Sequence, residues 1–238
     1  MLDHKHKTIF VHVPKAAGQS VEKVFIERNG LTWSDRAPLL LRENDNPAIG
    51  PERLAHLTAA EYYELGHVSR EEFGRLYKFA FVRNPWSRLV SAYVYRDIEY
   101  DMTFAQFAEE FLSLSDPMDI HYRHAMPQIA YLEDASGNML VDFVGRFENI
   151  AEDFRKVTEE LGLGPLELPH KNKSTQFGIF LRGKKSYLIR KGKQLVKSRK
   201  EQRHSHYSLY YDAKTLDLAT DYYRRDIEAF GYEFEDRR

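Results

Sequence analysis

A buried strand that runs into a helix is encoded in residues 8–20, which read TIFVHVPKAAGQS. The first six residues are mainly β-branched and aromatic, and Pro14 ends them, so they predict a strand. Gly18 marks a turn, and the apolar spacing of residues 19–28 predicts a helix. Backbone N–H groups at a strand–helix junction favour an anion, so the segment predicts a phosphate cradle.

Strands and helices alternate through most of the chain. Further strands are predicted at residues 77–82 and 140–144. Further helices are predicted at residues 86–97, 104–112, 149–161 and 216–230. This order is typical of an α/β fold of the P-loop-containing kind, with a mostly parallel central sheet flanked by helices on both faces.

Composition narrows the class of protein. The chain has 238 residues, a net charge of −1 and no cysteine, which excludes a thiolate metal site or a cysteine nucleophile. The apolar runs are too short for a membrane span or a signal peptide, so we expect a cytoplasmic protein. We expect one domain over residues 1–238 and no nucleic-acid partner.

One segment differs strongly from the rest in charge. Residues 182–206 contain ten lysines or arginines and one acid, Glu201, while the remainder of the chain carries −10. The segment is either a solvated loop or a lid-like, acceptor-side surface that concentrates a polyanionic substrate.

The cradle differs from that of a nucleotide triphosphatase. Such enzymes carry lysine directly after the second glycine of the loop. Here Gln19 follows Gly18, and Lys15 comes three residues before the glycine. Small residues at Ala16 and Ala17 still let the backbone approach an anion, and Ser20 adds a hydroxyl.

A second motif joins a strand end to a helix at residues 79–93, which read FAFVRNPWSRLVSAY. Arg83 falls at the carboxyl end of the strand, which is the ligand side of an open α/β sheet. Ser91 lies about two helical turns later. An arginine fork and a hydroxyl in this arrangement suit a single phosphate.

Together the two motifs resemble the sulfotransferase superfamily, most closely the Golgi-type carbohydrate sulfotransferases (sulfotransferase family 2) and their bacterial relatives. The resemblance implies a donor, 3′-phosphoadenosine 5′-phosphosulfate, whose phosphosulfate lies on residues 15–20 and whose 3′-phosphate lies on Arg83 and Ser91. It implies no metal. Weaker matches follow in the expected order, at Gly66-His67, residues 142–148, Asn172-Lys173-Ser174, Tyr210-Tyr211 and residues 230–232. Arg190-Lys191-Gly192 is similar to a 3′-phosphate clamp of the cytosolic sulfotransferases.

The resemblance also implies a mechanism. Sulfuryl transfer to an acceptor hydroxyl builds charge on the leaving oxygen, which we expect the Lys15 ammonium to stabilise. A general base must take the hydroxyl proton. Gly66-His67 resembles the family's catalytic histidine, so His67 is the first choice and His12 its main rival. Weaker candidates for the base are Glu22, His121, His124 and Glu148.

Two other functions stay open. A P-loop kinase would bind Mg-ATP, and a non-catalytic module on the same fold would hold a polyanion. The acceptor is expected to be a glycan or glycoconjugate, with an acidic one favoured by the basic segment, and the oligomeric state is undetermined. Three aromatic residues are candidates for stacking on adenine or sugar: Trp33, Trp86 and Tyr95.

Overall fold

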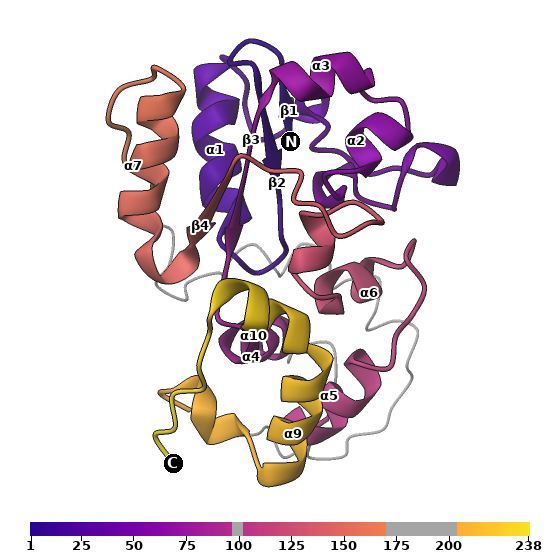
Figure 1. Cartoon of the computed structure of the whole chain (residues 1–238), viewed down its shortest axis with the longest axis vertical. Coiled ribbons are helices and arrows are strands. Elements are labelled where there is room, and N and C mark those ends of the chain that lie inside the picture. Colours follow the sequence, from indigo (N-terminus) through magenta and orange to yellow (C-terminus); the bar gives the residue numbers. More distant parts are fainter. Residues whose placement is uncertain (97–101, 170–203) are drawn as a thin grey trace, which may run out of the picture.

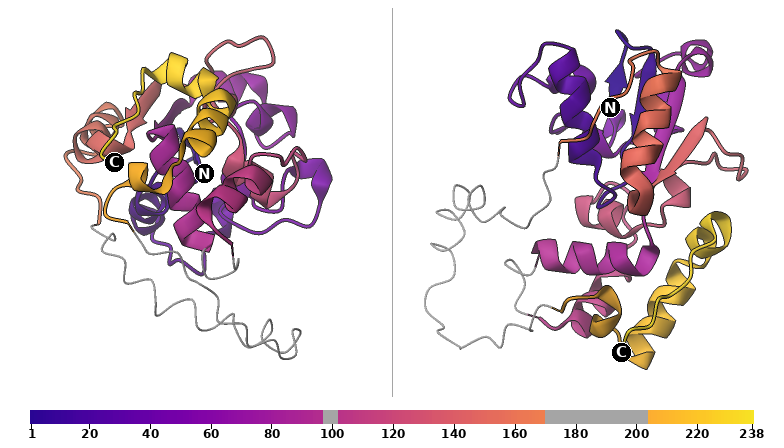
Figure 2. Two further views of the ribbon diagram at one scale, coloured as in Figure 1. Left: turned by 90° about the horizontal axis from the view of Figure 1, so that it is seen from below. Right: turned by 90° about the vertical axis from the view of Figure 1, so that its left-hand side faces the viewer.

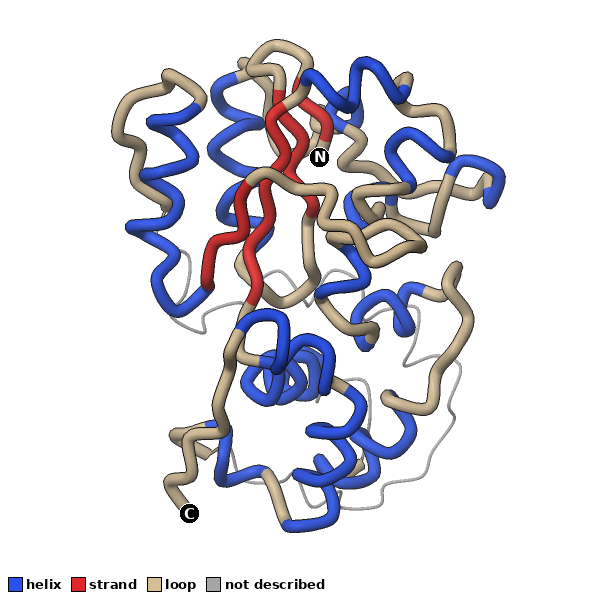
Figure 3. Tube along the Cα trace, viewed as in Figure 1, coloured by secondary structure: helices blue, strands red, loops and turns tan. Residues whose placement is uncertain are grey.

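The computed structural model of the chain describes residues 1–96, 102–169 and 204–238. Its sheet has the strand order β1 (Leu2–Asp3), β2 (Thr8–Val11), β3 (Tyr77–Val82) and β4 (Phe143–Arg146). Strands β2, β3 and β4 are parallel, and β1 pairs with β2 in the antiparallel sense. Figure 3 shows the strands in red between two groups of helices.

Helices cover both faces of this sheet, as the alternation predicts (Figure 1). Helices α1 (Gly18–Arg28) and α7 (Ile150–Glu160) lie on one side, and the short helices α2 (Glu61–Glu64) and α3 (Arg70–Arg75) lie on the other. All four residues of β2 are buried. Phe10 pairs in register with Phe79, and their rings stack with centroids 5.0 Å apart.

A second group of helices lies below the carboxyl ends of the strands (Figures 1 and 2). It contains α4 (Pro85–Arg96), α5 (Phe104–Phe111), α6 (Ile120–Ala125), α9 (Ala213–Tyr222) and α10 (Arg224–Phe230). Short 3-10 segments are Ala37–Leu39, Pro47–Ile49, Leu54–His56, Ile129–Tyr131, Phe147–Asn149 and Tyr207–Tyr210. No helix within the described ranges is long and apolar enough to cross a membrane.

Three predicted elements need correction. The strand predicted at residues 8–13 ends at Val11, because the chain turns there and the Val13 N–H donates to the Val11 carbonyl. The strand predicted at residues 140–144 begins at Phe143, because the Leu140 N–H donates to the Leu132 carbonyl and Asp142 instead accepts hydrogen bonds from Lys78. The helix predicted at residues 216–230 is two helices, because the chain leaves the helical path at Tyr223, whose ring is buried. The remaining predicted helices lie within one residue of their observed ends.

Candidate active site

The cradle between β2 and α1 is built from backbone in an uncommon conformation. Lys15 and Ala17 have φ angles of 68° and 67°, in the left-handed region that non-glycine residues rarely occupy. No side chain caps the start of α1, and its first turn holds no acidic residue. The positive end of the helix dipole is therefore available to an anion.

A neighbouring histidine ring leaves room only for glycine at position 18. A Cβ atom added at Gly18 would lie 1.9 Å from Nε2 of His12, which no real contact allows. The other ring nitrogen of His12, Nδ1, lies 2.5 Å from Oε1 of Glu22, and both side chains are buried. The imidazole is thus held between α1 and the strand end by a buried carboxylate, on the inner side of the cradle.

Arg83 joins the two sequence motifs in space. Its Nη1 donates to the carbonyl oxygen of Lys15 at 3.3 Å, across 68 residues of sequence. Its Nε and Nη2 donate to Oγ of Ser87 at 3.0 and 2.8 Å. The guanidinium also lies 4.3 Å from the ring centre of Phe147. The Arg83 guanidinium, just after the carboxyl end of β3, therefore also contacts the cradle.

The backbone of Arg83 is fixed separately by Gln128. The Gln128 amide accepts from the Arg83 N–H at 2.9 Å and donates to its carbonyl at 2.8 Å. Burial lowers the pKa of the Arg83 guanidinium from 12.5 to about 10, and the nearby Glu148 carboxylate partly offsets this effect. Arg83 is therefore charged at neutral pH, in a place with little water to solvate it, and an anionic ligand would compensate that burial.

Ser91, the other residue predicted for the 3′-phosphate, is half-buried on α4. It lies one turn beyond Ser87 on the same face, because residues four apart are neighbours on a helix. Lys15 also contacts α4. Its ammonium lies 3.9 Å from the ring centre of Tyr95, at the end of that helix. Helix α4 thus contacts the cradle through Tyr95 and carries both serines.

The other two aromatic candidates have different surroundings. Trp86 is buried and donates from its indole nitrogen to Thr220, so it belongs to the core. Trp33 is 45% exposed and lies against the guanidinium of Arg36. Of the three, Tyr95 contacts the Lys15 ammonium of the cradle.

His67 is held by the segment that precedes it. Its Nε2 donates to the carbonyl oxygen of Ile49 at 2.7 Å, and its ring contacts that of Tyr62. Gly66 precedes it with a φ of 74°, which places the imidazole at the turn between α2 and α3. The contacts of His67 therefore lead to the loop of residues 47–50 rather than to Lys15 or Arg83.

A groove of about 1080 Å³ lies beside the cradle. Tyr95 forms part of its wall, so the ring that contacts the Lys15 ammonium also lines the groove. Its carboxylates are Glu43, Asp45, Glu52, Asp116 and Asp119. The same wall holds a single arginine, Arg53, together with His121 and His124 from α6. The described lining is therefore acidic.

Three histidines form a row from the cradle to this groove. The rings of His12 and His56 have centroids 4.8 Å apart, and those of His56 and His124 are 5.2 Å apart and nearly perpendicular. Nδ1 of His56 donates to the His12 carbonyl at 3.5 Å. Burial, reinforced by the neighbouring His12, lowers the pKa of His56 well below 6.5, so His56 is neutral at neutral pH.

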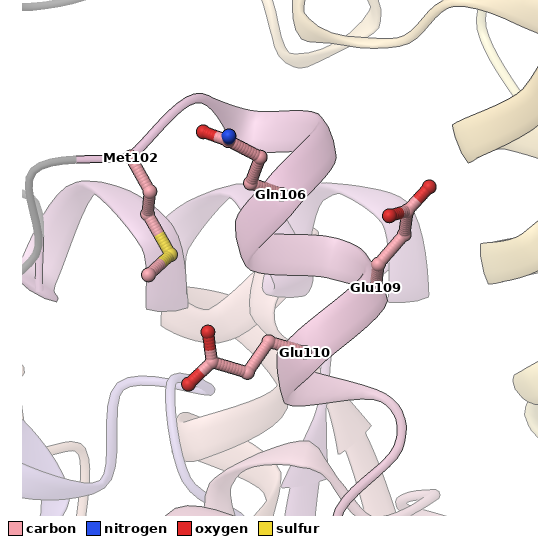
Figure 4. Close-up of a pocket in the computed structure, with 4 residues that line it drawn as sticks. All are labelled: Met102, Gln106, Glu109 and Glu110. Carbon is pink, nitrogen blue, oxygen red and sulfur yellow. The ribbon is translucent and has the colours of Figure 1, made fainter.

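A second hollow, of about 580 Å³, lies on α5 (Figure 4). Figure 4 shows Met102, Gln106 and Glu110 along one side of the helix and Glu109 on another. Glu109 is ion-paired with Lys214, and none of these residues belongs to either motif. This hollow has no evident part in the site.

Sequence reasoning missed several of these residues. Gln128 and His56 stand in segments with no motif, and nothing in their sequence surroundings points to the site. Phe147 lies within residues 142–148, which resemble the family. That resemblance was the sequence feature that could have indicated Phe147. The predicted residues 172–174 and 190–192, and most of the basic segment, lie outside the described ranges.

Comparison with known proteins agrees with this geometry. An uncharacterised protein of Archaeoglobus fulgidus is 30% identical over 112 residues, which cover 42% of this chain and 79% of that protein. No solved structure matches the chain. The profile of the sulfotransferase family matches residues 1–233. Because this match covers nearly the full length of the chain, the protein belongs to the sulfotransferase family.

Proposed function

We propose that the protein transfers a sulfuryl group from 3′-phosphoadenosine 5′-phosphosulfate to an acceptor hydroxyl, on a carbohydrate. The hydrogen bond from Arg83 to the Lys15 carbonyl carries the proposal, because it brings the two predicted phosphate motifs into contact. Membership of the sulfotransferase family supports the donor class.

The cradle suits the phosphosulfate end of the donor. The uncapped start of α1 offers N–H groups to an anion, and Ser20 and the exposed Gln19 stand at its first turn. We assign the Lys15 ammonium to the bridging oxygen on which negative charge develops as the sulfuryl group leaves. The backbone of Ala16, Ala17 and Gly18 completes the cradle.

The 3′-phosphate is assigned to Arg83 and Ser91. The guanidinium is half-buried and charged, and its bonds to the Ser87 hydroxyl and the Lys15 carbonyl fix its orientation before any ligand arrives. A preorientated cation loses little conformational entropy on binding a phosphate. Binding there needs no metal ion in our proposal.

The groove beside Tyr95 is assigned to the acceptor. Its acidic lining favours a neutral or cationic sugar over the acidic glycan suggested by the charge of residues 182–206. Of the two histidines first considered as base, His67 would have to use Nδ1, because Nε2 donates to Ile49. His12 is buried beneath Gly18 and bound to Glu22, so it is poorly placed to touch an acceptor.

A direct test is calorimetric binding of 3′-phosphoadenosine 5′-phosphate beside Mg-ATP. We expect the bisphosphate to bind wild type and to stabilise it by about 2.7 kcal/mol at roughly 100 times its Kd. Arg83→Ala should lose most of this affinity. Arg224→Ala removes an equal charge from an exposed pair with Asp221 and serves as the matched control.

The outcomes separate the three functions. Preference for Mg-ATP would establish the kinase alternative. Binding of neither nucleotide would contradict the proposal and turn attention to a polyanion module, whose affinity should fall steeply with salt. Equal losses in Arg83→Ala and Arg224→Ala would show that general charge, rather than the site, drives binding.

A further inference from the structure

Arg83 lies just beyond the sheet, where a side chain takes the place of a neighbouring strand. The pairing of β3 with its neighbours ends at Val82. The amide of Gln128 then accepts from the Arg83 N–H and donates to the Arg83 carbonyl, as the backbone of a strand would. Gln128 is fully buried, and peptide groups away from water need such partners. The amide therefore fixes the point from which the Arg83 side chain leaves the backbone.

The Asp226 carboxylate, in α10, fixes the direction of that amide. Its Oδ2 accepts from the backbone N–H of Gln128 at 2.8 Å and from Nε2 of the same residue at 3.3 Å, and its Oδ1 accepts from the Ile129 N–H at 2.9 Å. Burial raises the pKa of Asp226, and these bonds and the Arg88 charge partly offset that rise. A carboxylate accepts hydrogen bonds and does not donate them, so it faces the Gln128 NH2 group. The opposite orientation would place the amide oxygen against Asp226 and the NH2 group against the Arg83 N–H.

The segment that leads to Gln128 is anchored as well. Helix α6 ends at Ala125, three residues before Gln128, and a helix of this length is not stable alone. The Arg88 Nη2, from α4, donates to the carbonyls of Ala125 and Met126 at 3.1 and 2.6 Å, and the Tyr223 hydroxyl donates to Ala125 at 2.8 Å. Gln128 is therefore held by α4 on the side of α6 and by α10 on the other.

The position of the Arg83 guanidinium follows from that of the Arg83 backbone. Its N–H groups reach the Ser87 hydroxyl and the Lys15 carbonyl from that backbone position. An arginine fork that holds a phosphate needs its N–H groups in fixed directions, so a displaced backbone would weaken the contact. The cradle of residues 15–20 is built from separate backbone at the start of α1. A change at Gln128 should therefore weaken the binding of a 3′-phosphate more than the binding of a 5′-phosphate.

We propose that Gln128, oriented by Asp226, is the positioning residue that sets the place of Arg83 and thereby the preference of the donor site for a nucleotide with a 3′-phosphate. This role rests on the proposed function, in which Arg83 binds that phosphate. The Gln128 amide bonds to Arg83 and Asp226, so it acts on the nucleotide through Arg83. Nucleotide selectivity is therefore the property that Gln128 controls.

The test compares the affinities for 3′-phosphoadenosine 5′-phosphate and for adenosine 5′-phosphate by calorimetry. Methionine has a similar length to glutamine but no amide. We expect Gln128→Met to weaken the binding of the bisphosphate by about tenfold or more and that of adenosine 5′-phosphate by less than about twofold. Thr158→Val is the control for lost stability, because it removes a buried hydrogen bond to Arg155 within α7. It should keep the wild-type ratio of the two affinities.

Asp226→Asn is a milder variant, which gives the same information if Gln128→Met does not fold. All three groups that face Asp226 are N–H donors, so the new NH2 group meets a donor in either orientation. The preference for the bisphosphate should fall in the same direction as in Gln128→Met, by a smaller factor. Melting temperatures of each variant show how much of any loss accompanies a weakened fold.

A double-mutant cycle with Arg83→Ala separates positioning from a purely structural role. In the Arg83→Ala background, Gln128→Met should cause no further loss of affinity for the bisphosphate, because no guanidinium remains to be positioned. Equal losses in the two backgrounds would overturn the inference, and so would a Gln128→Met protein that keeps the wild-type ratio of affinities. A wild-type protein that binds the bisphosphate no better than adenosine 5′-phosphate would instead overturn the proposed function.

Discussion

The two ends of the proposed site are built in different ways. At the donor end, Arg83 is fixed through side chain and backbone, and the His12–Glu22 pair is buried. At the acceptor end, the groove wall is lined by carboxylates such as Asp45 and Glu52, which are exposed. The donor end is therefore preformed, and its substitutions should change both stability and chemistry. Substitutions of these exposed carboxylates should affect acceptor choice alone.

The largest expected effect is at Lys15. Lys15→Ala should lower the chemical rate by about 10²–10³-fold, because it removes the charge assigned to the leaving oxygen. Affinity for 3′-phosphoadenosine 5′-phosphate should fall much less. Single-turnover kinetics and calorimetry measure the two effects, and Lys23→Ala is the control, because Lys23 is a half-buried lysine on α1 that pairs with Glu27. An unchanged chemical rate would remove Lys15 from the mechanism.

The second largest effect is expected at Gly18, which packs against His12 at the donor end. Gly18→Ala should destabilise the fold by about 1–3 kcal/mol, because the new methyl group overlaps the His12 ring. In a His12→Ala background the same substitution should lower the free energy of unfolding by a smaller amount. Denaturant unfolding of the four proteins in this cycle measures the coupling. Additive free energies would show that the two residues do not compete for space.

The pH dependence of stability tests the buried histidine row. His56 has a folded pKa below its unfolded value of 6.5, so its contribution is full above about pH 6.5. As the pH falls below 6.5 the unfolded chain binds a proton that the folded chain rejects. The free energy of unfolding should fall by up to about 1.4 kcal/mol per pH unit. His56→Asn should flatten this slope below about pH 6.5, and an unchanged slope would contradict burial of a neutral ring.

The smallest effect is expected at the groove carboxylates. Asp45→Asn should change stability by less than about 0.5 kcal/mol, because the residue is exposed. It should raise the KM for a cationic acceptor and leave the affinity for 3′-phosphoadenosine 5′-phosphate unaltered. Glu110→Gln, in the other hollow, is the control. A change in nucleotide affinity would show that the two ends are not separable.

The fold of the two segments assigned to the donor could be predicted because its information is local. Strand, turn and helix follow one another within residues 8–28, and the same order recurs around Arg83. The sheet register then joins the two, since β2 and β3 are parallel neighbours. Adjacent parallel strands end at the same edge, so motifs after each strand meet there.

Contacts between residues distant in sequence could not be predicted at either end of the proposed site. Gln128 hydrogen-bonds to Arg83, which is 45 residues away in the sequence, and the His56 ring contacts that of His124, 68 residues away. No sequence motif marks Gln128 or His56. The error in the predicted start of the strand near Asp142 has a similar origin. Its carboxylate is used to hold Lys78 at the strand entrance, which is a tertiary contact that apolar patterning does not reveal.

The anchoring of α6 has a consequence for motion. Six residues of helix normally open and close locally, so their amide protons exchange with solvent quickly. Here the carbonyls of Ala125 and Met126 are tied to Arg88, and Arg123 is tied to Glu61. Exchange at this short helix should therefore require the same large opening as exchange in β3. If the groove holds the acceptor as proposed, a wall that moves only when the whole fold opens would select acceptors by shape rather than by closing around them.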